Sequence, residues 1–138
     1  MKLLKGLLTV NQENHFSHLG LLVLRLTFGF LMMRHGFSKM ENYSEFSSQF
    51  YDFLGLGAAF SLVLAIFSEF FCSLFIMLGL FTRYAAIPLI ITMIVIVFDV
   101  HGADPLSEKE LPVMYLGGYI VLLLNGGGKF SVDRFLVK

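Results

Sequence analysis

The stretch GAAFSLVLAIFSEFFCSLFIMLGLF, residues 57–81, decides how this sequence folds. It carries one charged residue, Glu69, within an otherwise uncharged and largely apolar run. A helix needs about 20 residues to cross the apolar part of a bilayer, and this stretch is long enough. A carboxylate near the bilayer centre costs roughly 2.5–3.5 kcal/mol. We therefore expect Glu69 to face a partner or a polar cavity, and we take it as the first candidate for a functional site.

The overall composition is that of a membrane protein. Of 138 residues, 57% are hydrophobic and 14% are charged, whereas soluble domains carry about 25% charged residues. The formal net charge is zero, so nothing suggests a nucleic-acid partner. Cys72 is the single cysteine, which excludes an internal disulfide and a cysteine-cluster metal site. We predict one transmembrane domain over residues 1–138, with no bound metal.

Four apolar stretches predict four membrane-spanning helices, at about residues 19–37, 57–81, 84–100 and 107–125. The sequence Ser107-Glu108-Lys109-Glu110 has the spacing of a capping box and is expected to start the fourth helix. Most basic residues fall on the side of the termini, which predicts that both termini are cytoplasmic. These residues are Lys2, Lys5, Arg83, Lys129, Arg134 and Lys138.

Each predicted span has one face of small or polar residues, which is typical of the interfaces between membrane helices. This pattern favours an all-α, antiparallel four-helix bundle with a partly polar interior. The faces are Arg25, Gly29, Met32 and Gly36 in the first span; Ala58, Ser61, Ala65, Ser68, Cys72 and Gly79 in the second; Pro88, Thr92, Val95 and Asp99 in the third; and Tyr115, Gly118, Tyr119, Leu122 and Asn125 in the fourth.

A short amphipathic helix is expected between the first and second spans. Phe46, Phe50 and Phe53 recur at helical spacing, with Ser44 as an N-cap and Gly55 as a stop. We favour the interpretation of this helix as an interfacial anchor. The alternative is a lid over whatever lies between the spans.

Arg25 is the predicted partner of Glu69. Counted from the inner ends of their helices at about 1.5 Å per residue, the two lie roughly 7 Å apart in depth, within reach of an arginine side chain. Such a pair would either fix the register of the helices or serve a function, and the sequence leaves both open.

The outer ends of the spans hold a second group of candidate residues. A histidine beside a carboxylate can exchange protons near neutral pH, so we assign proton exchange to Glu69 and His35. Lys39 and His101 lie at helix ends, where simple solvation is the favoured interpretation. The candidate substrate-binding residues are Arg25, Lys39, Asp99, His101 and Tyr115.

Three segments together resemble the DoxX family of small four-span bacterial membrane proteins. They are Arg34-His35-Gly36-Phe37-Ser38-Lys39, the run EFFCSLFIMLGLFTRYAA at residues 69–86, and Gly128-Lys129-Phe130-Ser131-Val132-Asp133. The resemblance implies a helical bundle in the bacterial inner membrane. For some members of the family it implies a link to quinone-coupled redox chemistry, and for others a role as membrane partner of a soluble redox enzyme.

Three functions follow from this resemblance and from the intramembrane charges. The first is a quinone-interacting subunit that receives electrons from a partner oxidoreductase, with quinone as the only cofactor implied. The second is a non-catalytic membrane scaffold for a redox partner. The third is a proton-coupled carrier of a small molecule, which would require a homodimer because four spans are few for a transporter.

Overall fold

A computed structural model describes residues 15–136, and every regular element in that part of the chain is helical. This confirms the predicted all-α fold class. Three segments, α4, η1 and α5, follow one another without a break and form one long helix, as do α6 and η2. The elements are α2 (His15–Glu41), α3 (Tyr43–Phe46), α4 (Ala58–Ile66), η1 (Phe67–Cys72), α5 (Ser73–Leu78), α6 (Thr82–Val95), η2 (Ile96–Val100), α7 (Leu106–Asn125) and α8 (Asp133–Leu136).

Three helical stretches are long and apolar enough to cross a membrane: His15–Glu41, Ala58–Leu78 and Thr82–Val100. They agree with the predicted spans to within about one helical turn. The predicted fourth span corresponds to α7, which begins with the charged residues Glu108, Lys109 and Glu110. A crossing by α7, and with it a bundle of four spans, stays a prediction.

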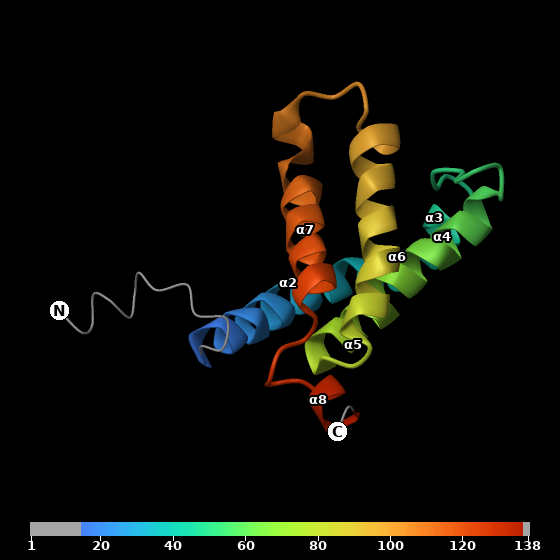
Figure 1. Ribbon diagram of the computed structural model, residues 1–138. Coiled ribbons are helices and arrows are strands. Elements are labelled where there is room, and N and C mark those ends of the chain that lie inside the picture. The colour runs from blue at the N-terminus through green and yellow to red at the C-terminus, as the bar shows by residue number, and fades with distance from the viewer. Residues whose placement is uncertain (1–14, 137–138) are drawn as a thin grey trace.

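The long helices form two antiparallel pairs. One pair is α2 with the helix built from α4, η1 and α5; the other is the hairpin of α6 and α7, which lie side by side over most of their lengths. In Figure 1 the α6–α7 hairpin runs at a steep angle to the first pair. The pairs meet where α6 packs against η1 and α5. The crossing therefore brings the middle of the second span next to the third.

The predicted interior faces are mostly correct. The buried residues of α2 are Arg25, Gly29, Met32 and Gly36, as the sequence predicts. Those of α7 are Tyr115, Gly118, Tyr119 and Leu122, whereas Asn125, predicted on the same face, is exposed. In α6 a different face is buried, because Ala85, Ala86, Leu89 and Met93 carry the packing.

The predicted amphipathic helix after the first span is wrong beyond its first turn. Helix α3 ends at Phe46, and the chain from residue 47 to 57 forms turns. Further along, Leu54, Gly55 and Gly57 adopt positive φ, which a right-handed helix cannot contain, so no helix can run through the end of the predicted segment. The carboxylate of Asp52 accepts a hydrogen bond from the Gly57 amide at 2.8 Å and stabilises this turn.

The predicted capping box is also wrong. Helix α7 begins at Leu106 with Pro105 as its N-cap residue, and no side-chain cap is formed there. Ser107 thus lies inside the first turn. Proline fixes φ near its helical value and has no amide hydrogen to satisfy, which suits it to the start of a helix.

Glycine at position 36 is predicted to be essential for the packing of the first pair of helices. A Cβ at Gly36 would lie 2.6 Å from the Phe70 nitrogen and 2.8 Å from the Glu69 carbonyl carbon, both backbone atoms that cannot move aside easily. We expect Gly36→Ala to lower stability by about 1–3 kcal/mol, measured as thermal unfolding in detergent.

Gly117→Ala is the matched control for this prediction. Gly117 also lies in a long helix, but a Cβ there would have open space around it. We expect its melting temperature to be unchanged or slightly raised. Equal melting temperatures for Gly36→Ala and Gly117→Ala would show that close approach at Gly36 does not matter.

Candidate functional site

Glu69 lies in η1, a π-helical segment in the middle of the second span. A π segment inserts an extra residue into the helical turn, and such segments often occur at functional sites. The side chain of Glu69 is 3% exposed, so it faces protein as the sequence predicts. In an apolar surrounding, a carboxylate in this position requires a partner.

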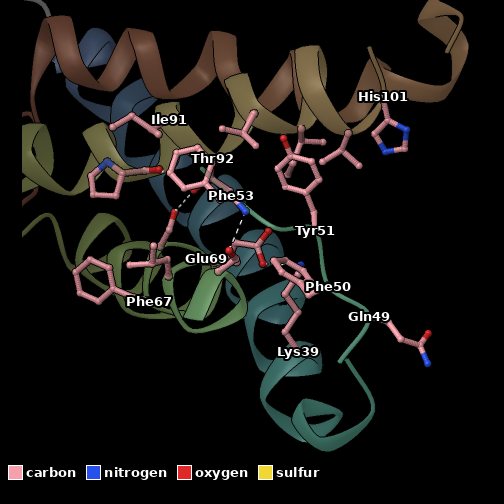
Figure 2. Close-up of a pocket in the computed structure, with 18 residues that line it drawn as sticks. Lys39, Gln49, Phe50, Tyr51, Phe53, Phe67, Glu69, Ile91, Thr92 and His101 are labelled. Atoms are coloured by element: carbon pink, nitrogen blue, oxygen red, sulfur yellow. Dashed lines mark hydrogen bonds and ion pairs between the residues drawn. The ribbon is translucent and has the colours of Figure 1, made fainter. Parts of the chain in front are cut away.

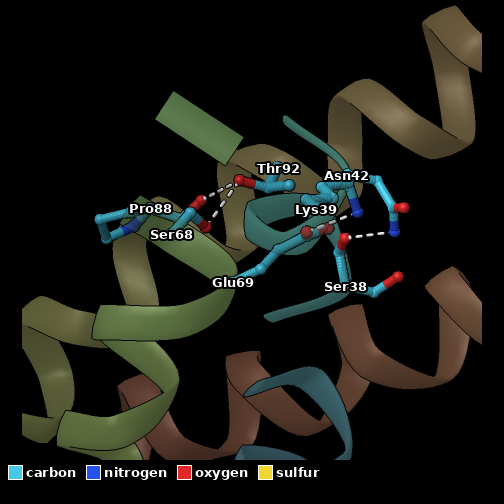
Figure 3. A network of polar contacts seen from close by, with 7 residues as sticks. All are labelled: Ser38, Lys39, Asn42, Ser68, Glu69, Pro88 and Thr92. Carbon is cyan, nitrogen blue, oxygen red and sulfur yellow. Dashed lines mark hydrogen bonds and ion pairs between the residues drawn. The ribbon is translucent and has the colours of Figure 1, made fainter. Parts of the chain in front are cut away.

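The partner of Glu69 is Lys39. The Lys39 Nζ lies 2.6 Å from a Glu69 carboxylate oxygen, and the lysine side chain is 22% exposed (Figure 3). Gly36 makes this contact possible, because it lets α2 approach the backbone of Glu69 and Phe70. Lys39 comes three residues later on the same helix, one turn further toward its end, and so extends over the carboxylate. The solvated interpretation of Lys39 is therefore wrong.

The predicted pair between Arg25 and Glu69 is wrong. Arg25 is 1% exposed, and within residues 15–136 all of its hydrogen bonds go to backbone carbonyls. Its Nε bonds Ile76 O at 3.0 Å, and its terminal nitrogens bond Met77 O at 3.2 Å, Phe130 O at 2.9 Å and Gly127 O. Ile76 and Met77 lie in the last turn of α5, at the negative end of the helix dipole, where a cation is favoured.

The register of α2 on the second span explains this outcome. Gly29 packs against Ser73 and Met77, whereas Gly36 packs against Glu69 and Phe70. Because the two helices are antiparallel, Arg25 lies beyond Ser73, toward Gly79, and Glu69 is about two helical turns away. A depth counted from predicted helix ends takes no account of which small residues meet, and it therefore indicated the wrong pair.

The ion pair borders a cavity of about 580 Å³ between the second and third spans (Figure 2). Apart from Glu69 and Lys39, the walls are largely apolar and aromatic. Leu64, Phe67 and Ile91 line the cavity, yet they are also 37%, 49% and 49% exposed. These three residues therefore mark a mouth on the apolar outer surface, the surface that a bilayer would cover.

The polar stripe predicted for the third span forms a wall of this cavity rather than a helix seam. Pro88, Thr92 and Val95 all line it. The Thr92 hydroxyl donates to the Pro88 carbonyl at 2.8 Å and lies 2.8 Å from the Ser68 hydroxyl (Figure 3). These two hydroxyls form a second polar group in the cavity, on the wall opposite Lys39. The contact between them also joins α6 to η1.

The turns after α3 cover one end of the cavity. Phe50, Tyr51 and Phe53 line it, and the Phe53 amide donates to Ser61 Oγ at 2.9 Å (Figure 2). Desolvation, followed by the charge and hydrogen bonding of Asp99, raises the pKa of the Tyr51 phenol above its ordinary value. Position and contacts thus favour the lid interpretation of this segment over the anchor.

The other predicted site residues fall into two groups. His101 lines the same cavity and pairs with Asp104 at 2.8 Å, while Asp99 is an exposed residue of η2 that interacts with Tyr51. His35 and Tyr115 line a separate cavity of about 390 Å³ between α2 and α7. The structure therefore places His35 and Glu69 in different cavities. Roles in binding or proton exchange for all of these residues stay predictions.

Asp133 is a structural residue that the patterns of hydrophobicity did not reveal. Its carboxylate accepts hydrogen bonds from the amides of Phe81, at 2.6 Å, and Thr82, at 3.0 Å. It thus caps the start of α6 from a distant part of the chain. The chain reversal at Gly79 lies beside it, because the Asp133 amide donates to the Gly79 carbonyl. The one signal of this capping role in the sequence is the short Ser-x-Asp motif that follows a run of glycines.

Comparison with known proteins places this architecture among bacterial membrane proteins. The sequence profile of the DoxX family matches residues 20–102. The chain is 29% identical to inner membrane protein YqjF of Escherichia coli over 86% of this chain and 93% of that protein. It is 28% identical to the uncharacterized membrane protein Rv3486 of Mycobacterium tuberculosis over 83% and 80% of the two chains. No solved structure matches.

Replacement of the guanidinium at position 25 is expected to destabilise the protein. Arg25→Gln removes the guanidinium that donates to carbonyls of α5 and of the 127–130 segment, at a cost of about 3–5 kcal/mol. Arg134→Gln, at an exposed position, is the control. Thermal melts in detergent should separate the two variants clearly. A wild-type melting temperature for Arg25→Gln would contradict a structural role for this residue.

Proposed function

This chain belongs to the DoxX family of membrane proteins, and from that premise we propose that it binds a quinone in the bacterial inner membrane and presents it to a redox partner. One observation carries the proposal. The ion pair of Lys39 and Glu69 lies at the border of an apolar cavity whose mouth faces the lipid side of the protein.

The ion pair suits both redox states of a quinone. The Lys39 ammonium can donate a hydrogen bond to a quinone carbonyl, and the Glu69 carboxylate can accept one from a quinol hydroxyl. Reduction of a quinone takes up two electrons and two protons. The electrons would come from a partner oxidoreductase, and Glu69 is the group placed to exchange protons with the quinone oxygens.

The size and the walls of the cavity support the same class of ligand. A volume of about 580 Å³ is within the ordinary range for sites that hold small organic molecules. Phe50, Phe53 and Phe67 supply aromatic surfaces for a planar ring. An isoprenoid tail would leave between Leu64 and Ile91 into the hydrocarbon of the bilayer, so the ligand would never have to cross water.

The proposal includes four spans with both termini in the cytoplasm. Helix α7 has 20 residues, about 30 Å of helix, which matches the thickness of a bilayer core. It also forms a close antiparallel hairpin with α6. Among the described residues, Arg83, Lys129 and Arg134 lie at the end of the molecule that carries the C-terminal segment, consistent with a cytoplasmic position.

Quinone binding is expected to depend on Glu69 and Lys39. Purified protein in nanodiscs should bind short-chain ubiquinone and menaquinone analogues, detected by calorimetry or by a rise in melting temperature. Glu69→Gln keeps the shape of the side chain but loses the charge. Its Kd should rise about tenfold or more, because a hydrogen bond to a charged group contributes about 1.5–3 kcal/mol.

Glu41→Gln is the matched control for this experiment, since Glu41 is an exposed residue at the end of the same helix as Lys39. Its Kd should equal that of the wild type. Absence of binding by both analogues in folded wild-type protein would remove the quinone proposal. Equal Kd values for Glu69→Gln and Glu41→Gln would remove the ion pair from it.

The membrane crossing of α7 can be tested separately. With four spans, green fluorescent protein fused after residue 138 should fluoresce, and alkaline phosphatase fused there should be inactive, because both would be cytoplasmic. Phosphatase fused after residue 103, in the loop before α7, should be active. An active phosphatase after residue 138 together with an active one after residue 103 would mean that α7 does not cross.

A further inference from the structure

The second cavity, between α2 and α7, has a different chemistry from the first. It measures about 390 Å³, and it shares no lining residue with the cavity that holds Glu69. The lining side chains carry a guanidinium, an imidazole, hydroxyls or apolar groups, and none carries a carboxylate. They are Leu31, Arg34, His35, Ser38, Leu111 and Tyr115.

Arg34 is the most unusual residue of this cavity. It is exposed, and its guanidinium takes part in none of the hydrogen bonds or ion pairs found within residues 15–136. The other arginines of the spans differ, because Arg25 donates to buried carbonyls and Arg83 donates to the Leu124 carbonyl. A guanidinium without a partner on a membrane helix is costly unless something outside the chain supplies one.

The depth of Arg34 in the membrane indicates which group outside the chain can be the partner of its guanidinium. Helix α2 has 27 residues, so it is about 40 Å long and extends through the hydrocarbon core into both headgroup layers. Arg34 precedes the end of α2 by about 10 Å along the axis. Its Cα therefore lies near the edge of the hydrocarbon, and its long side chain can reach the lipid phosphates.

We propose that this cavity binds the phosphate of an anionic phospholipid. The planar guanidinium of Arg34 would hold two phosphate oxygens at once. The His35 ring and the Ser38 hydroxyl, from the same end of α2, provide further donors around the same point. The lipid is held at the face where α2 meets α7.

The apolar walls favour a lipid over a dissolved anion. Leu31 and Leu111 flank the cavity and are 41% and 50% exposed on the outer surface. The first glycerol and acyl carbons of a lipid would cover this surface, whereas inorganic phosphate would leave it bare. Tyr115, which is 4% exposed and stacks on Tyr119, forms a rigid inner wall.

Native mass spectrometry of the purified protein tests this assignment. Wild-type protein should retain phosphatidylglycerol better than phosphatidylcholine with the same acyl chains. Arg34→Gln should lower retention of phosphatidylglycerol about tenfold, the equivalent of one hydrogen bond between charged groups. Ser38→Ala should lower it less. Lys109→Gln removes a positive charge from the same end of the molecule but outside the cavity, and it should retain the lipid as the wild type does.

Competition with inorganic phosphate separates a bound lipid from a dissolved anion. Inorganic phosphate at millimolar concentration should not displace the lipid; displacement would assign the cavity to a dissolved anion and overturn the proposal. Wild-type retention by Arg34→Gln, or an equal loss in Lys109→Gln, would overturn it as well. If Arg34→Gln does not fold, Arg34→Lys takes its place, because it keeps the positive charge but lacks the planar guanidinium. Retention equal to that of the wild type in both Arg34→Lys and Ser38→Ala would then overturn the proposal.

Discussion

The contact of Gly36 with the backbone of Glu69 and Phe70 determines how the first two spans fit together. Without a side chain at this position, α2 can lie directly against η1, and the neighbouring contact of Gly29 with Ser73 and Met77 fixes the same register further along. Membrane helices associate largely through such close packing, because burial in lipid offers no hydrophobic advantage. The polar partners of α2 follow from this register: it places Lys39 beside Glu69 and Arg25 beside the end of α5.

Among the described residues, the buried charged groups of Arg25 and Glu69 are satisfied in different ways. Arg25 is enclosed by backbone carbonyls at the end of α5 and in the segment after α7, so it joins three parts of the chain and leaves no side open. The Lys39–Glu69 pair instead borders a cavity and is partly accessible at its lysine. Arg25 therefore has the environment of a structural residue, whereas the ion pair has that of a site which can exchange partners.

The sequence predicted the positions of the long helices and the buried faces of α2 and α7 well, because both follow from local patterns of apolar and small residues. It also identified Glu69, since a lone carboxylate in an apolar run must be sheltered. It paired Glu69 with the wrong cation because depth along a helix does not determine register; the glycines at positions 29 and 36 contained that information. The sequence did not predict the turns after α3, where Leu54, a non-glycine residue, adopts positive φ.

The crossing of the two helix pairs explains why the cavity exists and why it has this composition. Four aligned helices would bring their small faces together and leave little space, whereas here α6 and η2 diverge from α4 beyond their contact with η1. This divergence opens the stripe of Pro88, Thr92 and Val95 on the third span to the cavity. The cavity therefore has helix walls on two sides and turns at its end. An ion pair in a packed core could be replaced by apolar residues at little cost. An ion pair at the border of an apolar space open to lipid is instead consistent with the proposed ligand, which carries a polar head and an apolar tail.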